Sequence, residues 1–397
     1  MKFEEITLKE ELMKGINNAG FTDLTLIQEK TVKPALEGTD IVGQSKTGSG
    51  KTAAFAIPIL EKVEGHGVQA IILTPTRELC VQVTDVFQQL GKHMNIRTTS
   101  VYGGVSLDNQ VHEIKKSQVV IGTPGRVLDH LNRQTLNLRG IKFFVLDEVD
   151  RMADMGFIED VERILSATNK EKQTLLFSAT LTPEVLDLVE NHLKKPITIK
   201  TDSYVEKQYL KQVYYDIMPK DKFSLLVHLL KKDGEGLKLI FCATRREVDI
   251  LTTNLKRQGI KVMAIHGGLT QPRRLKALEQ LRDEKINVLV ATDVAARGLD
   301  IKNVVTVYNY DVPKTSQEYI HRIGRTARAS QSGKAITLLT HHDHENFSRV
   351  LQDSSLEITS EQKPNFERIA FQRQTQQRRQ PGRGFPQRRG PPRRARR

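Results

Sequence analysis

Short runs of apolar, mostly β-branched residues alternate with amphipathic stretches along most of the 397-residue chain. The runs in the first half are VQAIILT, QVVIGT, KFFVLDE and QTLLFSA, and those in the second half are LKLIFCAT, INVLVAT and KNVVTVYN. Continuous apolar strands separated by helical patterns are typical of parallel sheets that helices cover on both faces. Two such series predict two doubly wound α/β domains in tandem.

The change between the two series predicts the domain boundaries. Apolar periodicity is lost in ITIKTDSYVEKQYLKQ, which follows the helix-like PEVLDLVENHLKK. We therefore predict a first domain over residues 1–205, a second over 206–362 and a tail over 363–397. In doubly wound domains, functional residues gather at the carboxyl ends of strands, where the following loops open.

The net charge of +14 is concentrated at the carboxyl terminus. The segment Arg368–Arg397 contains 11 arginines, no lysine and no acid, so it contributes +11 of the +14. It is also rich in Pro, Gly and Gln, a composition that predicts a disordered basic tail. An arm that binds RNA phosphates explains this composition better than a merely solubilising extension does.

Compartment and redox state are indicated by other features. The amino-terminal sequence MKFEEITLKEEL carries acids where a secretory signal needs an apolar run, and no apolar segment approaches the roughly 20 residues that span a bilayer. We therefore expect a cytoplasmic protein with no membrane partner. Cys80 and Cys242 lie far apart without CxxC spacing, so we predict reduced, buried thiols rather than a disulfide or a zinc site.

The sequence SKTGSGKT, residues 45–52, follows the short strand DIVGQ and precedes the helix-like TAAFAIPILEKV. Gly48 and Gly50 let backbone N–H groups converge on phosphate oxygens at a helix N-terminus, Lys51 adds charge, and the Thr52 hydroxyl can ligate Mg²⁺. A strict Walker pattern has glycine at the position of Ser45, but strand, loop and helix all agree. We predict a nucleotide site whose loop residues are Thr47, Gly48, Ser49, Gly50, Lys51 and Thr52.

The stretch FFVLDEVDRM, residues 143–152, places acids at the end of an apolar run. We predict that Asp147 holds magnesium through water and that Glu148 orients and deprotonates the attacking water. A solvated acidic strand end is the alternative for the two acids alone. The upstream phosphate loop favours the catalytic interpretation.

With these motifs in place, residues 3 to about 350 resemble a DEAD-box RNA helicase. The matching motifs, in order, are GFTDLTLIQ (20–28) with the upstream aromatic Phe3, the phosphate loop, PTREL (75–79), Gly103-Gly104, TPGR (123–126), DEVD (147–150), SAT (178–180), FCAT (241–244), HG (266–267) with Gln271 and Arg274, ATDVAARGLD (291–300) and HRIGRTAR (321–328). Each motif alone is weak, but their order over some 330 residues is specific.

The resemblance implies two RecA-like domains that close around ATP, Mg²⁺ and a single RNA strand. It implies a monomer that hydrolyses ATP when stimulated by RNA and unwinds short duplexes locally, with little sequence preference and with unknown protein partners. Phe21 would stack on adenine, Gln28 would hydrogen-bond it, and Asp300 would contact ribose or phosphates. The implied RNA contacts are Arg77, Gly104, Thr123, Arg126, Gln271, Arg274 and Thr292, and the residues implied to couple ATP to RNA are Asp150, Ser178, Thr180 and His321.

The chemistry of phosphoryl transfer points to a further pair of residues. The γ-phosphate needs charge stabilisation from both sides, and the first domain supplies Lys51 and magnesium from one side. Arg325 and Arg328, one helical turn apart, can supply the other side from the second domain. Such arginine fingers contribute about 10³ to 10⁵ in rate. A basic helix that binds RNA backbone is the alternative interpretation of RIGRTAR.

Four positions depart from the usual family pattern: Leu24 replaces Pro, Ser45 replaces Ala, Val149 replaces the Ala of DEAD, and Ala327 replaces Gly. Position 149 only has to pack at a strand end, which suits a β-branched residue, so we predict a tolerated packing variant. At position 327, alanine is strained if the backbone has positive φ and is harmless if the segment is helical. The sequence leaves both alternatives open.

Two other functional classes share much of this pattern. An RNA-binding clamp would use ATP only to lock the domains together, but the presence of Lys51, Glu148, Arg325 and Arg328 favours an enzyme. A DNA helicase or remodeller of the same superfamily is disfavoured by Gln28 and the RNA-type motifs.

Overall fold

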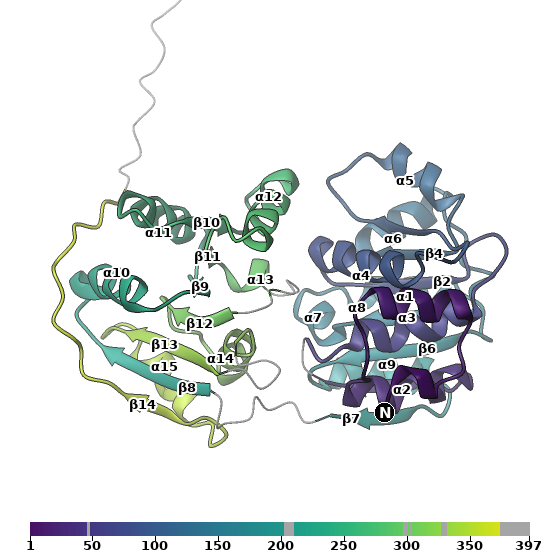
Figure 1. Cartoon of the computed structure of the whole chain (residues 1–397), viewed down its shortest axis with the longest axis horizontal. Coiled ribbons are helices and arrows are strands. Elements are labelled where there is room, and N and C mark those ends of the chain that lie inside the picture. Colours follow the sequence, from purple (N-terminus) through teal and green to yellow (C-terminus); the bar gives the residue numbers. More distant parts are fainter. Residues whose placement is uncertain (46–47, 202–209, 297–300, 302–303, 327–331, 374–397) are drawn as a thin grey trace, which may run out of the picture.

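The computed structural model describes residues 1–45, 48–201, 210–296, 301, 304–326 and 332–373. These residues form two α/β domains that lie side by side (Figure 1), each built on a seven-stranded sheet in which every strand pair is parallel. The prediction of two tandem doubly wound domains is confirmed. The predicted boundary at 205/206 falls in the gap between strands β7 and β8, outside the described segments.

The first sheet has the strand order β3-β4-β2-β5-β6-β1-β7. Its strands are β1 (Ile41–Gln44), β2 (Ala70–Leu73), β3 (Thr98–Val101), β4 (Val119–Gly122), β5 (Phe143–Asp147), β6 (Gln173–Ser178) and β7 (Ile197–Lys200). Its helices are the 3₁₀ helix η1 (Phe3–Glu5) and α1 (Glu10–Asn18), α2 (Leu26–Leu36), α3 (Lys51–Lys62), α4 (Arg77–Leu90), α5 (Leu107–Ile114), α6 (Pro124–Asn132), α7 (Val149–Asp154), α8 (Ile158–Ser166) and α9 (Pro183–His192). Strands β5, β6 and β1 are parallel neighbours, so their carboxyl ends lie side by side. The predicted acids, the SAT motif and the phosphate loop are therefore brought together at this carboxyl edge of the sheet.

Successive residues of the first sheet's strands point to opposite faces, and both faces are covered. Ile41 belongs to the core formed with α1 to α4, whereas Val42 belongs to the core formed with α6 to α9. Strands buried on both sides must be apolar throughout, which is why the sequence shows continuous apolar runs rather than alternation. The carboxyl edge of the sheet is therefore formed by strands that are packed on both faces.

The second sheet has the strand order β10-β11-β9-β12-β13-β8-β14. Its strands are β8 (Leu210–Asp216), β9 (Leu237–Phe241), β10 (Val262–Ile265), β11 (Val288–Ala291), β12 (Val304–Asn309), β13 (Gly333–Leu339) and β14 (Ile358–Ser360). Its helices are the 3₁₀ helix η3 (Pro219–Asp221) and α10 (Lys222–Lys232), α11 (Arg245–Arg257), α12 (Gln271–Arg282), α13 (Asp293–Ala296), α14 (Ser316–Ile323) and α15 (His344–Leu351). Helices α10 and α11 share one core with the sheet, and α14 and α15 share another.

The segment after β14 differs from the sequence prediction. Residues 361–373, which we call the strap, run along the outside of the second domain past α10 to α11, as the yellow trace in Figure 1 shows. Phe366, Ile369 and Phe371 pack against the core beneath α10 and α11. A disordered tail from residue 363 is therefore wrong for residues 363–373, because three apolar side chains of this otherwise polar segment pack against the second domain.

Cys80 and Cys242 are both buried free thiols, as predicted, and burial raises the pKa of each well above its ordinary value. Within the described segments, no helix is both long enough and apolar enough to cross a bilayer.

Candidate functional site

The phosphate loop leads into the amino terminus of α3. Gly50 is the N-cap residue with φ of 95°, and a Cβ there would lie 2.6 Å from Nε2 of Gln28, so this position needs glycine for both backbone conformation and space. The first helical residue, Lys51, is buried, and its Nζ donates to the Ser45 carbonyl at 3.0 Å. The backbone donors of a helix start and a lysine are thus gathered at the end of β1, as predicted. Thr47 lies outside the described part of the chain.

The residues predicted to read adenine lie next to this loop. Gln28 is buried, its Nε2 donates to the Gly50 carbonyl at 3.1 Å, and its Oε1 accepts from the Thr25 amide at 2.9 Å. Phe21 is half-buried and its ring stacks on that of Phe3 at 6.2 Å. The structure therefore brings Gln28 to the phosphate loop and ties the two together through one hydrogen bond.

Asp147, the last residue of β5, is buried, and its Oδ1 has no hydrogen-bond partner among the described residues. Burial raises its pKa to about 7, with Lys51 opposing the shift and the neighbouring Glu148 adding to it. A buried, unpartnered carboxylate oxygen is costly unless a cation or a proton meets it. Its hard oxygen suits Mg²⁺, and the Thr52 hydroxyl follows Lys51 at the start of α3, so these residues fit such an ion.

Glu148 has the left-handed backbone conformation, with φ of 56° and ψ of 53°, and caps the start of α7. This conformation costs of order 1–3 kcal/mol for a residue other than glycine and is typical of functional sites. Its carboxylate pairs with the buried guanidinium of Arg151, one turn along α7. Burial opposes ionisation of Glu148, but Arg151, Lys51 and Arg325 outweigh it and hold its pKa below the ordinary value.

The coupling residues predicted in the first domain are brought together. Oδ2 of Asp150 accepts from the amide of Thr180 at 3.0 Å and from its hydroxyl at 3.1 Å. The Asp150 amide donates to Oγ of Ser178 at 3.3 Å. Between Glu148 and Asp150, Val149 is fully buried in the core and contributes packing only. The DEVD stretch is therefore fastened to the end of β6.

From the second domain, Arg325 is buried and lies close enough to Glu148 to lower the pKa of that carboxyl. Arg322, which was not among the predicted site residues, anchors α14, the helix that ends two residues before Arg325. The Arg322 guanidinium donates to both carboxylate oxygens of Asp293, at 2.6 and 2.7 Å, and to Oδ1 of Asn309 at 3.1 Å. The available signal was an arginine on the same helix face as the buried Tyr319 and Ile323.

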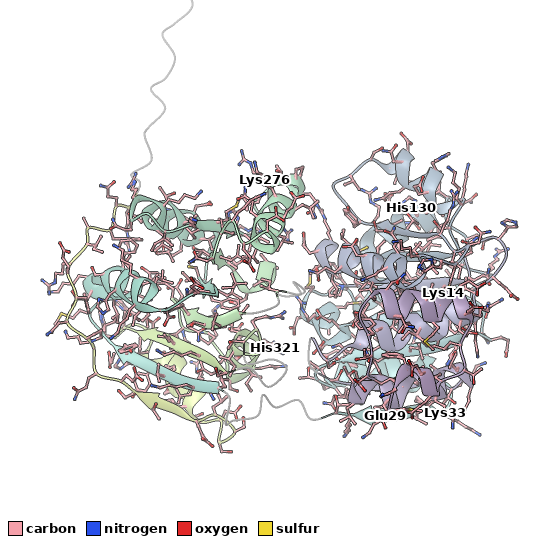
Figure 2. All side chains as sticks on the ribbon, viewed as in Figure 1. Lys14, Glu29, Lys33, His130, Lys276 and His321 are labelled. Carbon is pink, nitrogen blue, oxygen red and sulfur yellow. The ribbon has the colours of Figure 1, made fainter. Side chains whose placement is uncertain are left out.

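Of three more predicted residues, His321, Asp300 and Arg328, only His321 lies within the described ranges. Figure 2 shows His321, on α14, at the side of the second domain that faces the first. Asp300 and Arg328 lie outside the described ranges, as does Ala327, so both alternatives for the backbone at that position stay open.

Most predicted RNA contacts stand at the carboxyl edges of the two sheets. Arg77 begins α4 after β2, and its guanidinium lies against Gly104, where φ is 88° and a side chain would collide with it. Thr123 is the N-cap of α6 after β4, Arg126 follows within the same helix, and Thr292 precedes α13 after β11. These positions can present guanidinium, hydroxyl and amide groups to a sugar–phosphate strand.

The remaining two predicted RNA contacts have a different partner here. Nη2 of Arg274 lies 2.7 Å from Oε2 of Glu78, and Nε2 of Gln271 donates to Oε1 of Glu78 at 3.1 Å. Glu78 belongs to α4 of the first domain, and both partners belong to α12 of the second. Glu78 stands within the PTREL motif but was not among the predicted site residues.

One parallel α/β domain carries a phosphate loop and two acids, and a buried arginine of the second domain lies near one of these acids. These are the features of a nucleotide-binding protein with two RecA-like domains. Family models match both halves: DEAD/DEAH box helicase over residues 25–189 and helicase conserved C-terminal domain over 221–330. The chain belongs to the DEAD/DEAH box helicase family.

Similar curated proteins and solved structures fit this assignment. The chain is 43% identical over 358 residues to the ATP-dependent RNA helicase CshA of Listeria monocytogenes, covering 89% of this chain and 69% of that protein. It is 41% identical over 382 residues to the DEAD-box ATP-dependent RNA helicase CshA of Geobacillus kaustophilus, covering 94% and 82%. The chain spans 65% of the length of the Bacillus cereus CshA that it matches.

Among solved structures, S. cerevisiae Dbp5 bound to RNA and ADP BeF3 matches with a TM-score of 0.83 and 34% identity, covering 91% of this chain and 96% of that one. A DEAD box protein from Methanococcus jannaschii matches with a TM-score of 0.56 and 41% identity, covering 91% and 99%.

Proposed function

We propose that this chain is an ATP-dependent RNA helicase, which hydrolyses ATP when stimulated by RNA and uses closure of its two domains to separate short duplexes locally. The observation that carries the proposal is a site built from both domains. Lys51 of the first domain and Arg325 of the second both lie close enough to the Glu148 carboxylate to lower its pKa. The names of the curated relatives support RNA as the partner and ATP as the substrate.

The arrangement of the domains also supports a site shared between them. Over the same share of this chain, 91%, the RNA-bound Dbp5 structure has a higher TM-score than the M. jannaschii protein, although its sequence identity is lower. A TM-score over two domains depends on how the domains are placed as well as on their folds. The likeness to the RNA-bound structure therefore favours a closed arrangement around nucleotide and RNA.

In the proposed hydrolysis, the α3 amides and Lys51 bind the phosphates, Phe21 and Gln28 hold the adenine, and Asp300 contacts the ribose or the phosphates. Asp147 and Thr52 would hold Mg²⁺, which when bound supplies charge neutralisation at the phosphates. Glu148 accepts a hydrogen bond from the attacking water and takes its proton as the water oxygen bonds to the γ-phosphorus. The bond to the β–γ bridging oxygen breaks, and ADP leaves with that oxygen.

The low pKa of Glu148 affects how it acts. A strongly ionised carboxylate is a weak base, so its main task early in the reaction is to orient the water, and proton transfer follows as the phosphoryl group moves. Arg325 and Arg328 stabilise the charge that spreads over the transferring oxygens, which requires the second domain to be closed. Valine in place of alanine at position 149 leaves this chemistry unchanged, because the Val149 side chain is buried and contributes packing only.

RNA would lie across the carboxyl edges of both sheets. Arg77, Arg126, Thr123, Gly104 and Thr292 would contact phosphates and 2′-hydroxyls, which gives little sequence preference but discriminates RNA from DNA. Gln271 and Arg274 would act where the strand passes the domain junction, alongside their contact with Glu78. Asp150, Ser178, Thr180 and His321 would couple this surface to the ATP site. A cytoplasmic location and a monomeric state stay predictions.

One experiment tests the proposal. ATP hydrolysis by the full chain is measured alone, with single-stranded RNA and with DNA of the same sequence, together with strand displacement from an RNA duplex of about 12 base pairs. We expect RNA to stimulate hydrolysis strongly, DNA weakly, and displacement to require ATP. Lys51→Ala, which removes the phosphate-binding cation, serves as the inactive control. Hydrolysis that is indifferent to RNA, or equal with DNA, contradicts the proposal.

A further inference from the structure

The strap is fixed to the second domain by directional contacts as well as by apolar packing. The Ile369 amide donates to Oγ of Ser224 at 2.9 Å, and the Gln372 amide donates to Oδ1 of Asn254 at 3.0 Å. Nε of Arg368 pairs with the buried Asp221 carboxylate at 3.1 Å. Backbone hydrogen bonds to side chains of α10 and α11 therefore set the path of the strap along the second domain.

The strap ends at a cavity of about 840 Å³ on the carboxyl edge of the second sheet. Phe371 and Arg373 form part of its lining, and so do Thr244 after β9 and Thr292 after β11. Thr292 is one of the predicted RNA contacts. The volume lies within the range of sites that enclose a ligand of nucleotide size.

The deep charges in this cavity are largely compensated within the fold. Asp293 pairs with Arg322, and Lys222 pairs with Asp311 at 3.2 Å. Glu247 lies at the strap end, where burial and Asp311 raise the pKa of its carboxyl while Arg373 opposes the shift. Three cations of the lining are exposed: Lys220, Lys314 and Arg373. Within the described ranges none of their side chains forms an ion pair, although Arg373 lies near Glu247 and the Lys314 amide donates to the Glu318 carboxylate at 2.8 Å.

Phe371 is held at the cavity with limited freedom. Its ring centroid lies 5.0 Å from that of Phe223, and the side chain is only half-buried. A fixed, partly exposed aromatic ring beside exposed cations is the combination that proteins use to bind single-stranded nucleic acid, because every base has a π-face and every nucleotide a phosphate.

We propose that the end of the strap forms an additional RNA subsite, in which Phe371 stacks on a base and Arg373 and Lys314 contact the phosphates of a single strand that continues beyond Thr292. The inference rests on the proposed function, since it needs RNA at Thr292. The subsite holds nucleotides outside the strand clamped between the domains, and only at the end of that strand which lies over the second domain. In sequence, the nine arginines of residues 374–397 follow directly.

The experiment compares RNA strands that grow one nucleotide at a time from the shortest strand that fully stimulates ATP hydrolysis, extended either at the 5′ or at the 3′ end. Affinity is measured with a non-hydrolysable ATP analogue. For the natural chain, we expect the first few added nucleotides to raise affinity at one end only. Homopolymers should behave alike, because stacking tolerates sequence.

Two variants with matched controls locate the effect. Phe371→Ala should lower affinity for the extended strand by about tenfold, in line with the loss of one stacked base, and Arg373→Glu should also remove most of the gain. Phe366→Ala truncates an aromatic ring of the same strap away from the cavity, and Lys363→Glu makes a charge reversal on the same strap outside it. Both controls should keep the gain, and all four should keep hydrolysis with the shortest strand.

The outcomes separate this inference from the proposed function. If the natural chain hydrolyses ATP with RNA but gains equally from extension at either end, or if Phe366→Ala loses as much as Phe371→Ala, the subsite is wrong and the helicase proposal stands. If the natural chain shows no RNA-stimulated hydrolysis at all, the proposed function itself fails.

Discussion

Nη2 of Arg274 in the second domain lies 2.7 Å from Oε2 of Glu78 in the first, and the Glu78 side chain is almost completely buried. Gln271 donates to the other oxygen of the same carboxylate, so both acceptors of Glu78 are used across the domain junction. Glu78 lies in the first turn of α4, where the helix dipole stabilises a negative charge. The pair exists only while the domains are close, so its energy favours closure.

Arg274→Ala should therefore disfavour closure. Removing one partner leaves the Glu78 charge buried, which costs about 2–5 kcal/mol for pairs at interfaces, and we expect RNA affinity in the presence of an ATP analogue to fall by tenfold or more. Arg273→Ala, on the exposed neighbour, is the matched control and should change little. A double-mutant cycle with Glu78→Gln measures the coupling. Independent, additive effects of the two substitutions would show that the pair does not stabilise closure.

Glu148→Gln should abolish turnover while leaving ATP binding nearly intact, because the amide keeps the shape of the side chain but cannot take a proton. The variant also loses the charge that pairs with Arg151, so melting temperature is measured alongside. The expected signature is a persistent complex with ATP and RNA. Turnover within twofold of the natural chain would remove Glu148 from its proposed role.

Arg325→Ala should lower kcat by about 10³-fold or more, the usual effect of losing an arginine finger. Nucleotide binding should persist, since Lys51 and the α3 amides stand on the other domain. Arg325→Lys keeps the charge but not the planar fork, so we expect it to rescue only partly. A kcat for Arg325→Ala close to that of the natural chain would show that the two domains do not share the reaction.

Features that depend on residues close together in the sequence could be predicted, whereas features that depend on how the two domains are placed could not. The sheets and the phosphate loop follow from local patterns: continuous apolar runs, and glycines and a lysine between a short strand and a helix-like stretch. The structure then places Gly50 at φ of 95°, a conformation that suits glycine. The pairing of Arg274 with Glu78 depends on how two domains are placed, which no local pattern encodes. The Arg151–Glu148 pair, by contrast, joins residues three positions apart at the start of a helix, a spacing that the sequence itself shows.

The strap was missed for a compositional reason. Arg, Gln and Pro dominate the carboxyl-terminal sequence, and composition argues against a packed core. Phe366, Ile369 and Phe371 do not build a core of their own; they cover one that the second domain already has. A few apolar side chains suffice for that, because the strap only has to offset its own loss of conformational entropy.

Val149→Ala separates packing from chemistry at the departure from the common DEAD spelling. Val149 is fully buried in the core of the first domain, so losing two methyl groups should cost about 1–2 kcal/mol of stability. RNA-stimulated kcat should change less than about threefold, because no carboxylate is touched. Val161→Ala, at another fully buried valine of the same core, should lower the melting temperature similarly. A large gain in kcat at position 149 alone would mean that the valine restrains the reaction.

Deletion of residues 374–397 should reduce RNA affinity without affecting the chemistry. The structure places the cut after Arg373, since a cut at 368 would remove strap contacts with Ser224 and Asn254 and confuse lost charge with lost packing. Each phosphate neutralised on a single strand contributes about −0.7 to the slope of log K against log salt, so engagement of three phosphates by the nine arginines would flatten the slope by about two units.

The measurements for this truncation are RNA affinity across a salt series and ATP hydrolysis at saturating RNA, each compared with the full chain. We expect weaker binding, a flatter salt slope and kcat within a few-fold, because Glu148, Lys51 and Arg325 all lie outside the deleted segment. An unchanged salt slope would show that the arginines do not neutralise RNA phosphates. A collapse of kcat even at saturating RNA would make the segment part of the catalytic fold, because affinity no longer limits the rate once RNA is saturating.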